Sequence, residues 1–255
     1  MTVTISSKYL ASRKAVLQKE WTLDDIFTHP DFRLLYVPST NEQGGMTIIT
    51  PSKHRSSYLH GREFYALSHL WGTEPNKHMW DVSDLISDEE GTLVEPIPMR
   101  PEKRKTLLSL LQSNPGYWWI DVLCCRSDTP PVIMSGVYGC CKRCYAMIDC
   151  STSAIWYLSV KWDPNYLVQL FHPTGNYVGP MEKKEYLKKL FQYVYDVYDS
   201  RWFTRVWTLQ EATLPSCVIL LSETCDAYTE RKTIKLRSLL NRYGDVGKHA
   251  ECRTK

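Results

Sequence analysis

Tyr117-Trp-Trp-Ile-Asp-Val-Leu-Cys124 is a nearly continuous apolar run that only Asp121 interrupts. A short run that is apolar at consecutive positions is typical of a strand buried on both faces of a parallel sheet. Three further apolar runs have the same character, at Phe64–Leu70, Tyr145–Ile148 and Cys217–Leu221. We expect the strands that begin near Phe64, Tyr117 and Tyr145 to be neighbours in one mainly parallel sheet.

Segments with a helical pattern separate these runs. They are Pro101–Leu111, Pro130–Cys141, Glu182–Asp199, Arg201–Leu214 and Lys235–Tyr243. A proline suits the first turn of a helix, and Pro215 and Gly244 stand just beyond the last two segments, where helices end. The alternation of strands and helices predicts an α/β fold, with a mainly parallel central sheet flanked by helices and a helical C-terminal part.

Residues 1–60 have a different character from the rest of the chain. Lys8–Phe27 carries apolar residues in a loose helical pattern, and a polar stretch, Pro38–Gly45, precedes a short apolar strand at Met46–Thr50. We expect residues 1–60 to be an N-terminal extension packed on an α/β domain that covers residues 61–255.

The composition places the chain among ordinary globular proteins. Of its 255 residues, 43% are apolar and 23% are charged, and the net charge is +3. Lysines and arginines are scattered, so nucleic acid is not an expected partner. No apolar run reaches the length that a membrane span needs, and the N-terminal residues lack a signal-peptide pattern. Nine cysteines, an odd number, are then expected to be reduced thiols, and the expected location is the cytoplasm.

The cysteines allow two chemical hypotheses. Cys124 and Cys125 lie upstream of Cys140, Cys141 and Cys144, and four thiolates suit zinc. Cysteine more often serves as a small buried apolar residue, so we predict no metal site.

The other cysteine hypothesis is a nucleophilic Cys124 activated by His69. The chain has no P-loop, no G-x-G-x-x-G and no H-E-x-x-H motif, and we predict no cofactor.

Three segments in order carry a resemblance to a known family. They are Tyr65-Ala-Leu-Ser-His-Leu-Trp-Gly72, the run Tyr117–Cys124 and Arg205-Val-Trp-Thr-Leu-Gln-Glu211. They resemble the three signature blocks of the fungal heterokaryon-incompatibility (HET) domain, and Met134–Asp149 resembles the helix and strand between its second and third blocks. The loop Cys125–Pro131 departs from the family pattern, because it is shorter and lacks the usual Gln and Glu.

The resemblance implies a fold, a role and a chemistry. The family is distantly similar to Toll/interleukin-receptor domains, which have a flavodoxin-like parallel sheet, and some of those domains hydrolyse NAD with a glutamate. The implied role is an effector of fungal incompatibility and regulated cell death. The alternatives are a nucleotide (NAD-type) glycohydrolase and a non-catalytic, self-associating scaffold. The implied partners are a nucleotide ligand, a second copy of the chain or an incompatibility partner protein.

The first two blocks end where ligands bind in open parallel sheets, beyond the carboxyl ends of the strands. Candidate ligand-binding residues there are Ser68, Trp71, Gly72 and Cys124. Asp121 lies within an apolar run, where an ionised carboxylate is costly unless it is paired. It is either a structural acid that holds Arg205, Ser68 or a backbone amide, or a carboxylate of the functional site.

The third block adds further candidates. Trp207, Gln210 and Glu211 stand at i, i+3 and i+4 and would share one face of a helix, while Arg205 projects elsewhere. An aromatic ring beside an amide and a carboxylate suits a nucleoside, and it equally suits a tryptophan that faces the core. We predict Arg205, Trp207 and Gln210 as ligand-binding residues. The candidate catalytic carboxylates are Glu211, which we prefer, and Asp121.

Overall fold

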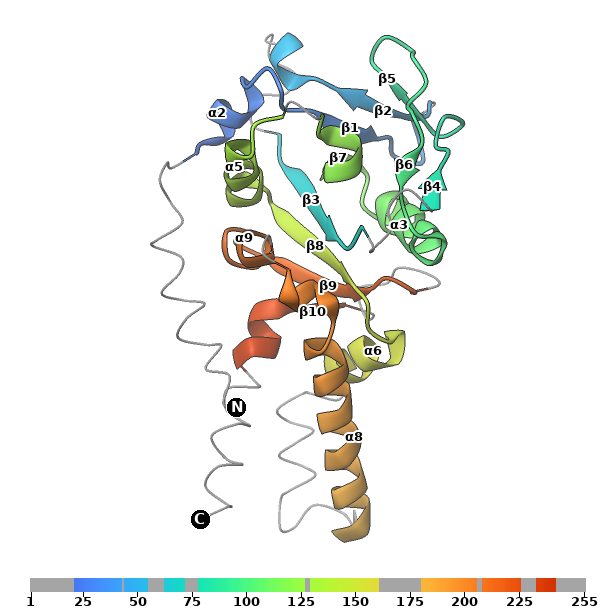
Figure 1. Cartoon of the computed structure of the whole chain (residues 1–255), viewed down its shortest axis with the longest axis vertical. Helices are drawn as coiled ribbons and strands as arrows, with labels where there is room; N and C mark the ends of the chain where they lie inside the picture. Colours follow the sequence, from blue (N-terminus) through green and yellow to red (C-terminus); the bar gives the residue numbers. More distant parts are fainter. Residues whose placement is uncertain are drawn as a thin grey trace.

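A computed structural model describes residues 21–42, 44–54, 62–71, 78–126, 129–160, 180–205, 208–225 and 233–241. Its main feature is an eight-stranded sheet in the order β10-β9-β8-β3-β7-β1-β2-β5 (Figure 1). The strands in chain order are β1 Leu34–Val37, β2 Met46–Ile49, β3 Phe64–His69, β5 Ile86–Asp88, β7 Gly116–Ile120, β8 Arg143–Ile148, β9 Val218–Ser222 and β10 Thr233–Lys235. A separate antiparallel pair joins β4 Met79–Trp80 to β6 Ile97–Pro98.

Four neighbouring strands, β7, β3, β8 and β9, are parallel to one another. In chain order β3 is the first of these strands, β7 the second, β8 the third and β9 the fourth. Across the sheet they lie in the order second, first, third, fourth, which is the 2-1-3-4 order of flavodoxin-like sheets. Nearly all their side chains are buried, as expected for strands covered on both faces. The predictions of an α/β fold and of neighbouring strands from Phe64, Tyr117 and Tyr145 are confirmed.

The N-terminal part contributes to the same sheet. β1 pairs antiparallel with β7, and β2 pairs antiparallel with β1. The strand at Met46 was expected, whereas β1 was not. Of the helix expected at Lys8–Phe27, the described part is α2, Leu23–Phe27, and residues 8–20 lie outside the described residues.

The helices flank this sheet. Three predicted helices are confirmed as α3 Pro101–Ser113, α5 Val132–Cys140 and α8 Pro180–Tyr198. α3 and α5 lie on opposite sides of the central strands, and α5 contacts α2 and α9, Thr208–Thr213 (Figure 1). α6, Thr152–Val160, packs against α8, which extends away from the sheet (Figure 1).

The expectation of one helix over Arg201–Leu214 is wrong. A 3-10 helix, η3, covers Arg201–Thr204, and Arg205 is extended before α9 begins at Thr208. The Thr208 hydroxyl bonds to the carbonyl of Trp202, whose ring is buried in the core. This tertiary anchor of Trp202 breaks the helix, and helical periodicity does not reveal it.

The last predicted helix is also shifted. Lys235 is the final residue of β10, and residues 236–241 are helical, while Tyr243 and Gly244 lie outside the described residues. No helix in the described part of the chain combines the length and apolarity that crossing a membrane requires.

Two glycines of α5 provide a matched test of the packing between α2 and α5. A Cβ on Gly136 would lie 2.8 and 2.9 Å from ring carbons of Trp21 and would also collide with Ile26, whereas a Cβ on Gly139 meets nothing within 4 Å. We predict that Gly136→Ala lowers the free energy of unfolding by about 1–3 kcal/mol, because the rigid indole must move. Gly139→Ala should be neutral or stabilise by up to about 1 kcal/mol, because alanine favours helix. Urea denaturation measures both, and equal effects would contradict the α2–α5 packing.

Candidate functional site

Polar residues gather where the four parallel strands end. Ser68 and His69 are the last residues of β3, Asp121 directly follows β7, and Asp149 directly follows β8. Glu223 directly follows β9. Since the carboxyl ends of parallel strands share one edge, groups from four distant parts of the sequence meet there, at the position where ligands bind in such sheets.

Glu211 lies at the centre of a buried hydrogen-bond network. Its side chain accepts a bond from the Ser68 hydroxyl at 2.6 Å and one from the Tyr138 hydroxyl at 3.4 Å. The Trp202 indole in turn donates to the Ser68 oxygen at 2.6 Å. An Arg205 nitrogen lies 3.8 Å from the carboxylate. Glu211 is 2% exposed, so this carboxylate is held almost entirely by protein groups.

Burial dominates the titration of Glu211. Loss of water raises the pKa of Glu211 above its ordinary value, although the Arg205 charge and the Ser68 hydrogen bond act in the opposite direction. A raised pKa means that the proton is retained to higher pH than in a free glutamate. Glu211 is therefore able to hold or accept a proton at the sheet edge.

We expected Asp121 to lie inside a strand, and the structure places it elsewhere. It is the first residue of α4, Asp121–Cys124, immediately beyond the end of β7. The expected partners Arg205 and Ser68 contact Glu211 instead. Sequence alone did not assign each partner to its acid, because both acids come to the same edge from distant segments.

Two side chains of the first block and a backbone amide, the third of the expected partners, hold Asp121. Its carboxylate is bonded to His69 Nε2 at 3.1 Å and to the Trp71 indole N–H at 2.7 Å, and the backbone N–H of Val122 donates at 2.8 Å. Burial by itself raises the pKa of Asp121, but the charge of His69 and these hydrogen bonds outweigh it and hold the pKa below its ordinary value.

Several contacts hold Trp71 in place, although 41% of the residue is exposed. Asp121 holds its indole, and two cations hold the carbonyl groups before it. Arg205 donates to the His69 carbonyl at 2.8 Å, and Lys103 donates to the Leu70 carbonyl. An exposed aromatic ring that is fixed in advance loses little conformational freedom when a ligand or partner covers it.

The remaining candidates of the sequence analysis lie in or near the third block. Gln210 is in α9 next to Glu211, and its side-chain oxygen is buried without a hydrogen-bond partner among the described residues. Gly72 and Trp207 lie outside the described residues, and so does the shared face predicted for Trp207, Gln210 and Glu211. α9 begins at Thr208, one residue after Trp207.

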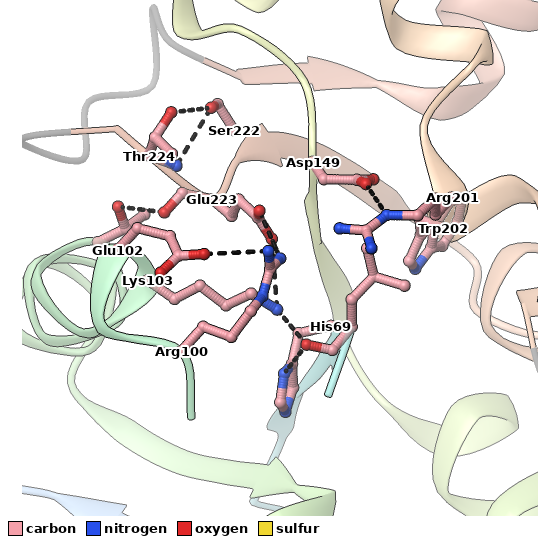
Figure 2. Close-up of polar contacts among 12 residues, drawn as sticks. His69, Arg100, Glu102, Lys103, Asp149, Arg201, Trp202, Ser222, Glu223 and Thr224 are labelled. Atoms are coloured by element: carbon pink, nitrogen blue, oxygen red, sulfur yellow. Dashed lines mark hydrogen bonds and ion pairs between the residues drawn. The ribbon is translucent and has the colours of Figure 1, made fainter. Parts of the chain in front are cut away.

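The structure also contains a buried cluster of cations that the sequence did not predict. Lys103 is fully buried and lies 3.3 Å from Glu223, which also binds Arg100 (Figure 2). Burial lowers the pKa of Lys103 to about 8, although the Glu223 charge acts in the opposite direction. In the sequence this lysine is one of several charged residues in the first turns of a helix, and nothing distinguishes it from its exposed neighbours.

Cys124 does not form a pair with His69. Its thiol contacts the backbone of Ile120 and Trp118, and His69 Nε2 faces Asp121. Burial raises the pKa of Cys124 to about 12, so its thiolate is not formed near neutral pH. Within the described ranges, no three His, Cys, Asp or Glu side chains are grouped to hold a metal ion.

Comparison with known proteins assigns the matched segment to one family model. The model, described as heterokaryon incompatibility protein (HET), matches residues 64–211. This span begins with β3 and ends at Glu211, so it includes all three sequence blocks and both candidate carboxylates. No curated protein and no solved structure matches the chain.

The opposite pKa shifts of the two acids predict different effects on stability. Asp121 has a lowered pKa, so its contribution is present above the ordinary Asp pKa and is lost as the pH falls through the lower folded value. We predict that Asp121→Asn lowers the free energy of unfolding at pH 7 by about 1–3 kcal/mol, because His69 and Trp71 lose a charged acceptor. The loss should shrink as the pH falls below about 4.

Glu211→Gln is the matched comparison. The raised pKa of Glu211 means that its contribution is present below the ordinary Glu pKa and is lost as the pH rises through the folded value. A neutral glutamine resembles the protonated form, so the penalty at pH 7 should be about 1 kcal/mol or less. Urea denaturation at pH 7 and at about pH 3 measures both variants. A larger loss for Glu211→Gln than for Asp121→Asn at pH 7 would contradict these assignments.

Proposed function

The chain belongs to the heterokaryon incompatibility (HET) family, whose model covers more than half of it, and on that premise we propose that it is an effector of fungal incompatibility that causes regulated cell death. The proposal further places the protein in the cytoplasm, where it would meet a partner or a second copy.

One observation supports a shared functional site for the three blocks. Ser68 of the first block bonds to Glu211 of the third across 143 sequence positions. His69 and Trp71 of the first bond to Asp121 of the second. The side chains that define the family pattern therefore contact one another at the edge of the sheet. Buried ionisable groups with shifted pKa values at such an edge favour a functional site over packing alone.

A second candidate function is hydrolysis of a nucleotide at its glycosidic bond, as in NAD. The supporting observation is that the environments of Glu211 and Asp121 shift their pKa values in opposite directions. Such a pair can divide the roles of acid and base. Here Asp121 would be the ionised carboxylate and Glu211 the group that holds or accepts a proton. Either carboxylate could stabilise the oxocarbenium-like transition state of glycosidic cleavage.

Cell death is tested by inducible expression in a fungal host. We predict that the wild-type chain arrests growth and that Glu211→Gln removes the effect at equal protein level and nearly unchanged melting temperature. The matched control is Glu185→Gln, an exposed glutamate on α8, which should remain toxic. Normal growth at high expression of the wild type, with or without a protein that clusters it, would argue against the effector role.

Glycosidic cleavage is tested with purified protein and NAD, followed by chromatography. We predict release of nicotinamide by the wild type and by Glu185→Gln, and none by Glu211→Gln, because the latter cannot exchange a proton. Intact NAD at high protein concentration would exclude this reaction. Toxicity combined with intact NAD would favour a non-catalytic scaffold that acts by self-association.

A further inference from the structure

Arg201 is fixed beside the sheet edge by one side of its guanidinium group. It is the first residue of η3, and its Nε donates to Asp149 Oδ2 at 2.6 Å. The other oxygen of Asp149 accepts a bond from the Ser200 hydroxyl at 2.5 Å. Both oxygens of Asp149 are thus engaged, and this carboxylate positions the arginine from the end of β8. No residue in the described part of the chain bonds to the two terminal nitrogen atoms of Arg201.

Arg201 differs in exposure from the other cations at this edge. Its side chain is 54% exposed, compared with 24% for Arg205 and 14% for Arg100, and Lys103 is fully buried. These three are occupied by Glu211, Glu223 and backbone carbonyl groups. Arg201 is therefore the cation at this edge that is open to an incoming group.

The neighbourhood contains a second unsatisfied donor. Arg100 binds Glu223, whose backbone N–H donates to the carbonyl of Ile148, the residue before Asp149. The Nε–H of Arg100 is buried and has no hydrogen-bond partner within the described ranges. An unpaired buried donor in a native structure indicates an unseen partner such as a water molecule or an ion.

The charges around Arg201 are balanced. Arg100, Lys103 and Arg201 supply three positive charges. Glu223, Asp149 and Glu102, which lies 3.0 Å from Arg100, supply three negative charges. What Arg201 offers an anion is therefore its open hydrogen-bond donors and not an excess of positive charge.

We propose that Arg201, oriented by Asp149, binds a phosphate group at the carboxyl ends of β8 and β9. The fork of a guanidinium group matches the oxygen atoms of a phosphate and forms two parallel hydrogen bonds with it. In Arg201 the contact with Asp149 uses only Nε, so the two terminal nitrogen atoms keep their donors. The inference goes beyond the proposed function, because it concerns binding of an anion and requires neither toxicity nor turnover.

The experiment is calorimetric titration of the purified full chain with inorganic phosphate at constant ionic strength, with acetate and chloride as competing anions. We predict that phosphate binds the wild type more tightly than acetate does and that Arg201→Gln weakens phosphate binding by roughly tenfold or more, as for other charge-assisted pairs. Arg201→Lys should be intermediate, because it keeps the charge without the fork. Arg237→Gln, at an exposed arginine in the helical segment 236–241, should bind like the wild type.

A second arm identifies the source of the phosphate. Adenosine monophosphate and adenosine are titrated beside inorganic phosphate. Tighter binding of the monophosphate than of phosphate, with loss of that binding in Arg201→Gln, supports a phosphorylated ligand, and equal affinity supports free phosphate. Binding of phosphate to Arg201→Gln with wild-type affinity, or absence of any phosphate-specific heat in the wild type, overturns the proposal. Neither negative result affects the cell-death test, which measures growth.

Discussion

Parallel pairing of β7, β3, β8 and β9 is the constraint on which the rest of this structure depends. Parallel strands need crossover connections, so both faces of the sheet are covered and its interior is apolar. Polar side chains are then costly along the strands and are tolerated at their ends. This explains why Ser68, His69, Asp121, Asp149 and Glu223 all lie within the last two residues of a strand or directly after it.

The charges at this edge are compensated in pairs. Asp121 faces His69, Glu211 faces Arg205 and Asp149 faces Arg201. Burying an ion pair costs desolvation energy that the attraction does not always recover, so such pairs are weak evidence for stability. Removal of Asp121 alone is nevertheless expected to be damaging, because His69 and Trp71 lose their charged acceptor. At this edge the fold therefore tolerates the desolvation cost of ion pairs, and these pairs fix the orientation of the charged side chains.

The side chains at this edge differ in their exposure to solvent. Glu211 is buried, whereas Trp71 and Arg201 reach the surface and are held by Asp121 and Asp149. A fixed aromatic ring and a fixed guanidinium group present binding surfaces that need little reorganisation. These exposed groups lie on the two sides of β3, the strand at which the order of the sheet reverses.

Apolar runs and helical spacing were sufficient for the α/β class, for the central strands and for α3, α5 and α8, because these features depend on local periodicity. The blocks around Ser68, Asp121 and Glu211 likewise identified segments whose polar side chains meet at the edge of the sheet. The sequence could not reveal β1, which depends on pairing with β7, or the break after Thr204, which depends on the burial of Trp202.

Partner assignments were the least predictable feature. Ser68 and Arg205 were expected near Asp121 and contact Glu211, while Lys103 and Arg201 had no local signal at all. The physical reason is that periodicity encodes which face of an element is buried, whereas a hydrogen bond between residues 143 positions apart is decided only when the strands are packed side by side. The sequence by itself thus determined the fold class, the family pattern and the segments that meet at the edge of the sheet. Tertiary structure decided which acid holds which donor and which cation is open to solvent.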